Sequence, residues 1–249
     1  DYMRDTVREI DYAGKRILCA GGEVPFDYCI IAAGSTTHFF GTAGADRYAF
    51  TLKSLDDSMV LRNHILTCFE RAAHVADDEA RKRLLTFVIV GGGPTGIEFA
   101  GALAELIRGP LKKDFRRLDM SALRVVLLEA SDRVLSFFSK KTSDYTERLL
   151  KKRGVQVVTG GRVKEIDYGK VALADGAVIP TETVVWTAGV RGEEVGGVAG
   201  PFSGEKRIKT DDALRVRGQD RCYVAGDLAW LEQKGAPLPM IAPVAVQQG

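Results

Sequence analysis

The chain has 249 residues, of which 45% are hydrophobic and 27% charged, a composition typical of a globular protein rather than a disordered or fibrous one. The 35 Lys and Arg residues nearly balance the 33 Asp and Glu residues, which argues against a nucleic-acid partner and against a strongly basic membrane-binding patch. No apolar run reaches the roughly 20 residues of a membrane-spanning helix, and the 4 cysteines show neither metal-ligand nor Cys-x-x-Cys spacing.

The N-terminal third has the pattern of short strands followed by a helix. Residues 6–11, 15–20 and 26–32 alternate between apolar and polar side chains across glycine turns, which predicts antiparallel strands. Residues 54–76 then carry apolar side chains at helical spacing. We expect an amphipathic helix there, with Ser54 as its N-cap.

The middle of the chain has the pattern of a nucleotide-binding fold. Continuous apolar strands alternate with helices, which predicts a right-handed βαβ unit in a parallel sheet, a Rossmann-type α/β fold. The expected elements are a strand at 84–90, a helix at about 95–108 that stops near Gly109-Pro110, a strand at 124–129, and a helix at 139–153 ended by Gly154.

Short strands return in the last third. The segments VQVVTG, GRVKEID, KVALAD and AVIP alternate again, and the segments at 182–189 and 221–229 are apolar strands. This order suggests one domain inserted within another. We expect the insert at about 81–198, flanked by the segments 1–80 and 199–249 of a second domain.

Four glycines, at 91, 92, 93 and 96, stand where the strand at 84–90 meets its helix. Glycine inside regular structure costs about 0.5–1 kcal/mol relative to alanine, so the cluster needs a cause. Gly91 permits a tight turn, Gly93 lets the backbone approach a pyrophosphate, and Gly96 allows the helix to pack on the strand. Free N–H groups at the helix N-terminus then face the anion. The alternative is a plain tight turn.

Acidic residues near this turn refine the prediction. Glu129 ends the next strand, where a carboxylate accepts hydrogen bonds from the ribose of NAD and repels the 2′-phosphate of NADP, so NADH is favoured. The nearby Arg133 favours some tolerance of that phosphate. Alternatively, Glu129 is a solvated strand-end carboxylate, Glu98 in the first helical turn only interacts with the helix dipole, and Asp227 only caps a helix.

Together these motifs resemble the type II NADH:quinone oxidoreductases, flavoproteins with two dinucleotide-binding domains. The most specific stretches are FVIVGGGPTGIEFAGAL and LKSLDDSMVLRN. Further similar stretches, from about residue 28 to the last, are YCIIAAGS, VVLLEASDRVL, VVWTAGV, RCYVAGDLA and PLPMIAPVAVQQG.

The resemblance implies a respiratory-chain NADH dehydrogenase that passes hydride from NADH to FAD and then two electrons to a quinone. It places the NADH-binding domain at 81–198 and parts of the FAD-binding domain at 1–80 and 199–249. It assigns NADH to Gly91, Gly92, Gly93, Pro94, Thr95, Gly96 and Glu129, with Ala188 and Gly189 near the nucleotide and Glu98 near the nicotinamide–flavin contact. It assigns FAD to Ala32, Ala33, Gly34, Gly226 and Asp227, and places Gln247 and Gln248 beside the flavin and quinone.

The chain departs from the family at Pro243, where members usually carry glutamine after the alanine. We expect both ends to be cut, with an FAD-binding glycine loop upstream and a membrane-docking segment downstream. The alternatives are an NADH-dependent ferredoxin, rubredoxin or disulfide reductase, or an NADH-binding module without turnover. The expected location is cytoplasmic, with the parent protein peripheral on the inner membrane and a possible homodimer.

Overall fold

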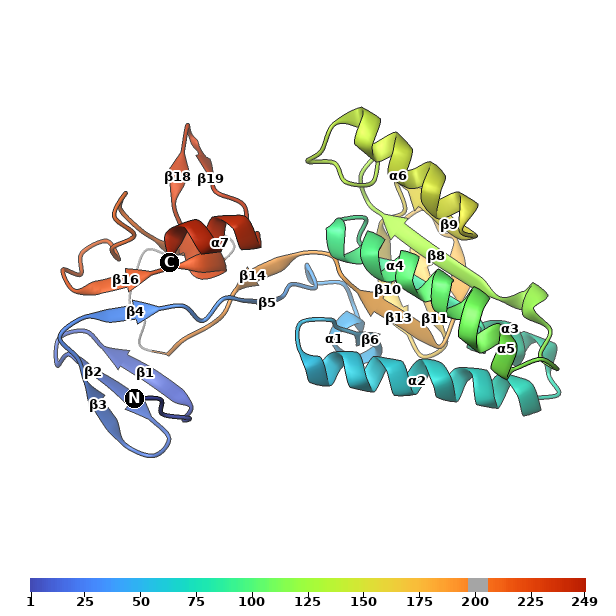
Figure 1. Ribbon diagram of the computed structural model, residues 1–249, viewed down its shortest axis with the longest axis horizontal. Coiled ribbons are helices and arrows are strands. Elements are labelled where there is room, and N and C mark those ends of the chain that lie inside the picture. The colour runs from blue at the N-terminus through green and yellow to red at the C-terminus, as the bar shows by residue number, and fades with distance from the viewer. Residues whose placement is uncertain (197–205) are drawn as a thin grey trace. The chain divides into compact units, whose positions relative to one another are not determined.

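The computed structural model describes residues 1–196 and 206–249, which form two compact units (Figure 1). Unit 2 is the continuous segment Phe39–Gly189. Unit 1 combines the two flanking segments, Asp1–His38 and Val190–Gly249. The chain therefore leaves unit 1, completes unit 2 and returns.

A five-stranded, all-parallel sheet is the centre of unit 2. Its strand order is β6-β13-β7-β8-β9. The strands are β6 (Ala49–Phe50), β7 (Thr86–Val90), β8 (Arg124–Glu129), β9 (Val155–Thr159) and β13 (Thr183–Trp186). The predicted parallel βαβ arrangement of the strands at 84–90 and 124–129 is confirmed, and VQVVTG extends the same sheet as a parallel strand instead of joining an antiparallel one.

Helices cover one face of this sheet (Figure 1). They are α2 (Leu55–His74), α3 (Asp78–Leu84), α4 (Pro94–Leu106) and α6 (Lys140–Lys152). Because side chains alternate along a strand, Phe87 and Ile89 of β7 join the helix-side core, whereas Val88 and Val90 point to the opposite face. Both faces of β7 are buried, which explains its uninterrupted apolar sequence.

A small antiparallel sheet covers the opposite face. It consists of β10 (Val163–Asp167), β11 (Lys170–Leu173) and β12 (Val178–Pro180), and the short helix α1 (Ala45–Tyr48) contributes Ala45. Its buried residues Ile166 and Val171 pack with Val126 and Val184 of the parallel sheet. Unit 2 therefore has three layers: helices, parallel sheet and antiparallel sheet.

Local capping chemistry sets the ends of two helices as predicted. The Ser54 hydroxyl accepts a hydrogen bond from the Asp57 N–H at 3.0 Å, and the Asp57 carboxylate accepts one from the Ser54 N–H at 3.3 Å. Such a capping box stabilises a helix by about 1 kcal/mol. The Ser139 hydroxyl caps α6 by accepting a hydrogen bond from the Thr142 N–H, and Gly154 follows that helix at a φ of 76°.

The predicted stop of the glycine-turn helix near Gly109-Pro110 is wrong. The chain stays helical through a π-helical turn at Ile107–Leu111 and continues as α5 (Lys112–Asp114). A proline inside an α-helix removes one backbone donor and crowds the preceding turn. The wider π turn accommodates Pro110, while Ile107 and Leu111 stay buried in the helix-side core. A 3₁₀ turn at Met120–Ala122 then leads into β8.

Unit 1 consists of small sheets around a separate core. The antiparallel strands β1 (Val7–Asp11), β2 (Arg16–Cys19) and β3 (Glu23–Pro25) form one sheet. The pairs are β4 (Cys29–Ile31) with β16 (Cys222–Val224), β5 (Ser35–Thr37) with β14 (Val190–Gly192), β15 (Ile208–Lys209) with β17 (Ala229–Trp230), and β18 (Glu232–Gln233) with β19 (Ala236–Pro237). A 3₁₀ helix (Gly226–Leu228) follows β16, and α7 (Ala242–Gln248) lies near the C-terminus.

The expected antiparallel pairing of residues 26–32 is wrong. Strand β4 pairs in parallel with β16, with Cys29 opposite Cys222 and Ile31 opposite Val224. The buried residues Cys29, Ile31, Cys222 and Val224 share one core. This contact with a distant segment, and not the adjacent hairpin, therefore determines the pairing of β4.

The compact units differ from the expected insert at 81–198. Unit 2 begins earlier, because α2 buries Leu61, Ile65 and Phe69 against its core and β6 pairs with β13. It ends at Gly189, whereas the expected boundary between residues 198 and 199 lies outside the described residues.

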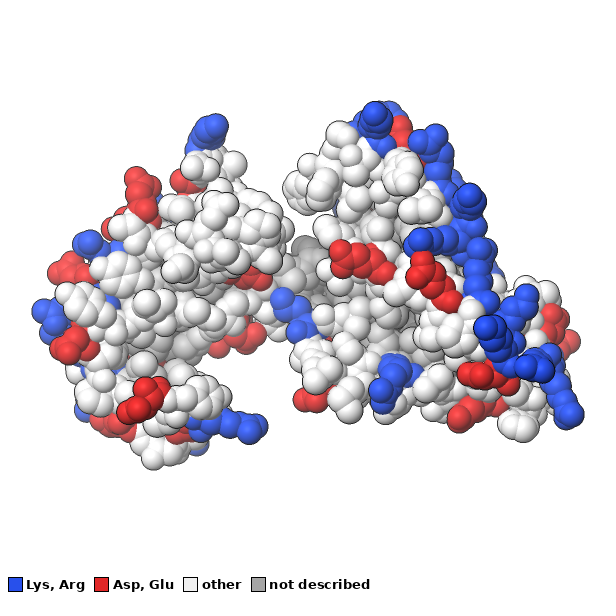
Figure 2. Space-filling model, in the orientation of Figure 1, with Lys and Arg blue, Asp and Glu red and all other residues white. Residues whose placement is uncertain are grey.

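The balanced net charge conceals a local concentration of basic side chains. Figure 2 shows a band of Lys and Arg over α6 and toward α5 of unit 2. Part of this charge is paired, because Lys140 contacts Asp144 at 3.0 Å and Lys151 contacts Glu147 at 2.6 Å. Among the described residues, no helix is long and apolar enough to cross a membrane.

Candidate functional site

The glycine turn joins β7 to α4 at the carboxyl edge of the parallel sheet, and two of its glycines are required by close packing. Gly91 has a φ of 112°, and a Cβ there would lie 2.7 Å from the backbone nitrogen of Ala188. A Cβ on Gly96 would lie 1.9 Å from the carbonyl oxygen of Gly91. The first glycine therefore allows the turn, and the last lets α4 pack on the end of β7.

Gly93 differs from these two residues, because no packing contact requires it. It is the N-cap of α4 at a φ of −77°, and a Cβ there would meet no atom within 4 Å. No side chain caps this helix, and Pro94 occupies its first turn. The N–H groups of an uncapped helix N-terminus are donors for an anion, and the helix dipole favours negative charge there. A diphosphate fits this open, side-chain-free position.

Glu129 is held at the end of β8 by two backbone groups. Its Oε2 accepts a hydrogen bond from the Gly92 N–H at 2.7 Å, and its Oε1 accepts one from the Ser131 N–H at 2.7 Å. A Cβ on Gly92 would lie 2.8 Å from that Oε2, so the second glycine makes room for the carboxylate. The half-buried Glu129 is therefore a positioned acceptor and not a freely solvated strand-end carboxylate.

Thr187, which sequence reasoning missed, connects the end of β13 to the glycine turn. Its N–H and its hydroxyl both donate to the carbonyl oxygen of Val90, each at 2.9 Å. The adjacent Ala188 contacts the turn through Gly91, and Gly189, with a φ of 67°, ends the unit. Thr187 lies inside the predicted VVWTAGV motif, where its position before Ala188-Gly189 was the available signal.

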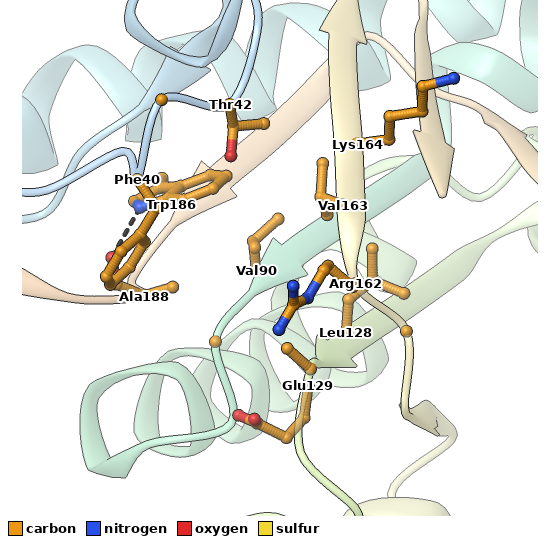
Figure 3. Close-up of a pocket in the computed structure, with 14 residues that line it drawn as sticks. Phe40, Thr42, Val90, Leu128, Glu129, Arg162, Val163, Lys164, Trp186 and Ala188 are labelled. Carbon is orange, nitrogen blue, oxygen red and sulfur yellow. Dashed lines mark hydrogen bonds between the residues drawn. The ribbon is translucent and has the colours of Figure 1, made fainter. Parts of the chain in front are cut away.

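A cavity of about 490 Å³ lies beside the glycine turn, at the carboxyl ends of β7, β8 and β13 (Figure 3). Gly91, Glu129 and Ala188 line it, as do residues that sequence reasoning did not select: Phe40, Gly41, Thr42, Val90, Leu128, Ala130, Gly161, Arg162, Val163, Lys164 and Trp186. Trp186 is fixed by its indole N–H, which donates to the carbonyl oxygen of Ala188 at 2.6 Å. Ligands of open α/β sheets bind at this edge of the strands.

Two predicted features of this region are placed differently by the structure. Glu98 is not in the first turn of α4, which contains no acidic residue; it is exposed one turn later, where interaction with the helix dipole has weakened. The Arg133 guanidinium donates to the carbonyl oxygen of Ser136 at 2.8 Å and does not line the cavity. Pro94 and Thr95 lie at the exposed start of α4, as predicted.

The predicted flavin residues meet at one edge of unit 1. Parallel pairing of β4 with β16 brings Ala32, Ala33 and Gly34 to the same end as Gly226 and Asp227. The hydroxyl of Ser35 donates to the Asp227 carboxylate at 2.6 Å. Asp227 caps no helix, because the N-cap of the 3₁₀ helix is Ala225 and no side chain caps it. The helix-cap interpretation is therefore wrong.

The two C-terminal glutamines are in different environments. The Gln248 side-chain oxygen accepts a hydrogen bond from the Gly226 N–H at 2.7 Å, whereas its buried Nε2 has no partner among the described residues. A buried donor without a partner costs about 1–3 kcal/mol, so this amide fits a ligand acceptor. Gln247 is exposed. Pro243 lies in the first turn of α7, a position where proline is tolerated.

The four cysteines are free thiols, and Cys29, Cys68 and Cys222 are buried. Burial raises the pKa of the Cys222 thiol to about 11 and raises the pKa of the Cys29 thiol in the same direction. The thiolate is the reactive form, so these two neighbouring residues are poor nucleophiles. No group of three or more His, Cys, Asp or Glu side chains in the described ranges is arranged to hold a metal ion.

Comparison with known proteins gives the family. Residues 1–249 match the family of pyridine nucleotide-disulphide oxidoreductases. The chain belongs to this family. Membership, together with the parallel sheets, confirms the α/β fold class and the group of flavoproteins to which the sequence motifs pointed.

Within the pyridine nucleotide-disulphide oxidoreductases, the chain is similar to the type II NADH:quinone oxidoreductase Ndh of Mycobacterium tuberculosis, with 35% identity covering 97% of this chain and 54% of that protein. It is 31% identical to the external alternative NAD(P)H-ubiquinone oxidoreductase B2 of Arabidopsis thaliana mitochondria, over 94% of this chain and 43% of that protein. The chain spans about half the length of the curated relatives it matches.

A solved structure has the same fold. The structure of NDH2 from Plasmodium falciparum in complex with NADH aligns with a TM-score of 0.85 at 24% identity, over 92% of this chain and 50% of that chain. At this level of identity the likeness shows the fold alone.

Proposed function

We propose that the chain forms the NADH site and part of the FAD site of a flavoprotein that transfers hydride from NADH to FAD and two electrons onward to a quinone. The open, uncapped glycine turn beside the cavity is the observation that carries this proposal. When bound, NADH supplies the hydride and FAD accepts it, so the residues of the chain bind and orient rather than react.

At the NADH site, Gly93 would leave room for the diphosphate bridge, and backbone N–H groups of the uncapped first turn of α4, at Thr95 and Gly96, would donate to it. Glu129, fixed by Gly92 and Ser131, retains oxygen lone pairs that accept from a ribose hydroxyl. Ala188 and Gly189 would support the nicotinamide half of NADH, and the exposed Glu98 would lie near the nicotinamide.

At the flavin site, Asp227 accepts hydrogen bonds from a flavin hydroxyl while Ser35 orients the carboxylate. Gly34, with a φ of 73° and no atom within 4 Å of an added Cβ, lets the cofactor approach the backbone beside Ala32 and Ala33. The unpartnered Gln248 Nε2 donates to the flavin, and Gln247 faces the electron acceptor.

A quinone is the proposed acceptor because relatives at 35% and 31% identity are named as quinone and ubiquinone oxidoreductases. Pro243 stands where members usually carry glutamine, and α7 forms with this proline in its first turn. The buried cysteines, with raised pKa values at Cys29 and Cys222, favour quinone over a disulfide substrate within this part of the protein.

The test uses the purified protein loaded with FAD. The yellow colour should bleach when NADH is added without air, and a short-chain quinone should restore it within seconds. If ferredoxin or a disulfide restores the yellow colour and quinone does not, the electron acceptor is that compound and not a quinone. NADH binding without any bleaching would leave only a nucleotide-binding module. No NADH binding at all would contradict the whole proposal.

We also propose that the parent protein is a cytoplasmic protein, peripheral on the inner membrane, and forms a homodimer. Cell fractionation with a salt wash tests the first statement, since a peripheral protein is released by salt. Light scattering of the purified protein tests the second, and a monomer mass at micromolar concentration would contradict it.

A further inference from the structure

Arg162 lies at the NADH cavity and is held there by its backbone. It follows the Gly160-Gly161 turn and precedes β10. The Gly161 N–H donates to the carbonyl oxygen of Glu129 at 2.9 Å, and the carbonyl oxygen of Arg162 accepts from the Ala174 N–H at 2.9 Å. These two bonds fix the Cα of Arg162 beside the end of β8.

The Arg162 side chain points into the cavity, toward the ends of β7 and β8. Figure 3 shows its guanidinium group between Val90 and Glu129, whereas the ammonium group of Lys164 points away from the cavity. Within the described part of the chain, the Arg162 guanidinium makes no hydrogen bond or ion pair, unlike that of Arg133, which donates to Ser136. Its donors are therefore available to a ligand.

A cation beside the glycine turn would reduce the repulsion between negative charges there. The diphosphate bridge of a dinucleotide carries two negative charges, and the nearby Glu129 carboxylate adds a third. Glu129 also occupies the Gly92 N–H, a donor in the middle of the glycine turn. The turn thus offers fewer free donors and more negative charge than its four glycines suggest.

We propose that Arg162 binds the phosphate oxygens of the dinucleotide and offsets the repulsion from Glu129. A guanidinium presents several donors in a planar fork that matches phosphate oxygens. Arg162 is thus an affinity-determining residue that works together with the glycine turn. This inference rests on the proposed NADH site, because it assigns a residue within the same cavity.

The experiment measures dissociation constants of the purified protein for NADH, ADP and NADPH by calorimetric titration. Arg162→Gln should weaken NADH and ADP binding by about tenfold, since a tenfold change corresponds to about 1.4 kcal/mol, a modest energy for one partly screened charge pair. Arg162→Lys should recover most of the affinity, because it keeps the charge. Lys164→Gln, which removes the same charge two residues away from a side chain that points away from the cavity, should change affinity by less than about twofold.

The outcomes separate this inference from the proposed function. If the wild-type protein binds no NADH, the proposed function fails first. If the wild type binds NADH and Arg162→Gln binds equally well, only the role of Arg162 is overturned. Equal losses of NADH affinity in Arg162→Gln and Lys164→Gln would indicate a long-range electrostatic effect of the positive charge, and would overturn a direct contact between Arg162 and the phosphates. A loss confined to NADPH would assign Arg162 to the 2′-phosphate, and so overturn the diphosphate contact.

Discussion

Gly96→Ala should destabilise unit 2 even though alanine is the better helix former. The intrinsic preference of a helix for alanine over glycine is worth up to about 1 kcal/mol. Against this, the new Cβ would lie 1.9 Å from the carbonyl oxygen of Gly91 and 2.7 Å from the hydroxyl of Thr187. Ordinary contacts begin at 3.4 Å, so α4 must move away from β7 by about 1.5 Å.

The backbone carbonyl at this contact has no alternative rotamer, so the cost lies at the upper end of the overpacking range, about 3 kcal/mol. Subtraction of the helix preference leaves a net loss of about 2 kcal/mol. For a unit of this size, such a loss lowers the melting temperature by about 4–8 °C.

A matched control is available on the same helix. Gly101 is also buried in α4, but a Cβ there would meet only the Arg153 side chain, at an ordinary 3.4 Å. Gly101→Ala should therefore be neutral or stabilising by about 0.5–1 kcal/mol. In a Trp230→Phe background, fluorescence of the buried Trp186 follows urea unfolding of unit 2 alone. A urea midpoint of Gly96→Ala equal to that of the wild type, or equal losses of stability in Gly96→Ala and Gly101→Ala, would refute this account of the turn.

Three further predictions concern binding and pH. Gly93→Val should abolish NADH binding while the melting temperature changes by less than about 3 °C, because an added Cβ meets open space; retained calorimetric binding would contradict the role of the turn. Glu129→Gln should reduce the preference for NADH over NADPH several-fold, since the neutral amide no longer repels a 2′-phosphate, and an unchanged ratio of kcat/KM values would remove that role. Burial lowers the pKa of His64, so near pH 6.5 the unfolded chain takes up a proton that the folded chain does not. The free energy of unfolding should therefore be highest above pH 6.5 and should decline as the pH falls below that value. His64→Gln should flatten the decline in urea midpoint between pH 7 and pH 5, and an equally steep decline in the variant would assign it to other groups.

The features predicted correctly from the sequence depend on local chemistry. Ser54 and Ser139 cap their helices with their own side chains, and Gly154 adopts a left-handed conformation that other residues rarely adopt. Buried strands such as β7 need apolar residues on both faces, so their sequences stand out. The glycine turn follows such an apolar strand and contains glycines with special local conformations, so it could be recognised from the sequence.

The features that sequence reasoning missed depend on distant parts of the chain. Strand β4 pairs with β16 because the two strands share a core, and no pattern within either strand encodes its partner. Arg162 stands outside every motif, and only the fold brings it to Glu129. The π turn at Pro110 was also hidden, because proline usually signals the end of a helix.

The pairing of β5 with β14 has a consequence for how the two units fold. Thr37 lies opposite Val190, and Ser35 opposite Gly192, so the two strands that lead into and out of unit 2 lie side by side. While unit 2 is unfolded, it is a flexible loop of about 150 residues whose closure opposes this pairing by roughly 4 kcal/mol. Once folded, it offers ends that are already close together, and most of that entropic penalty disappears. A ligand that stabilises the folded form of unit 2 therefore also raises the free energy of unfolding of unit 1, without contacting it.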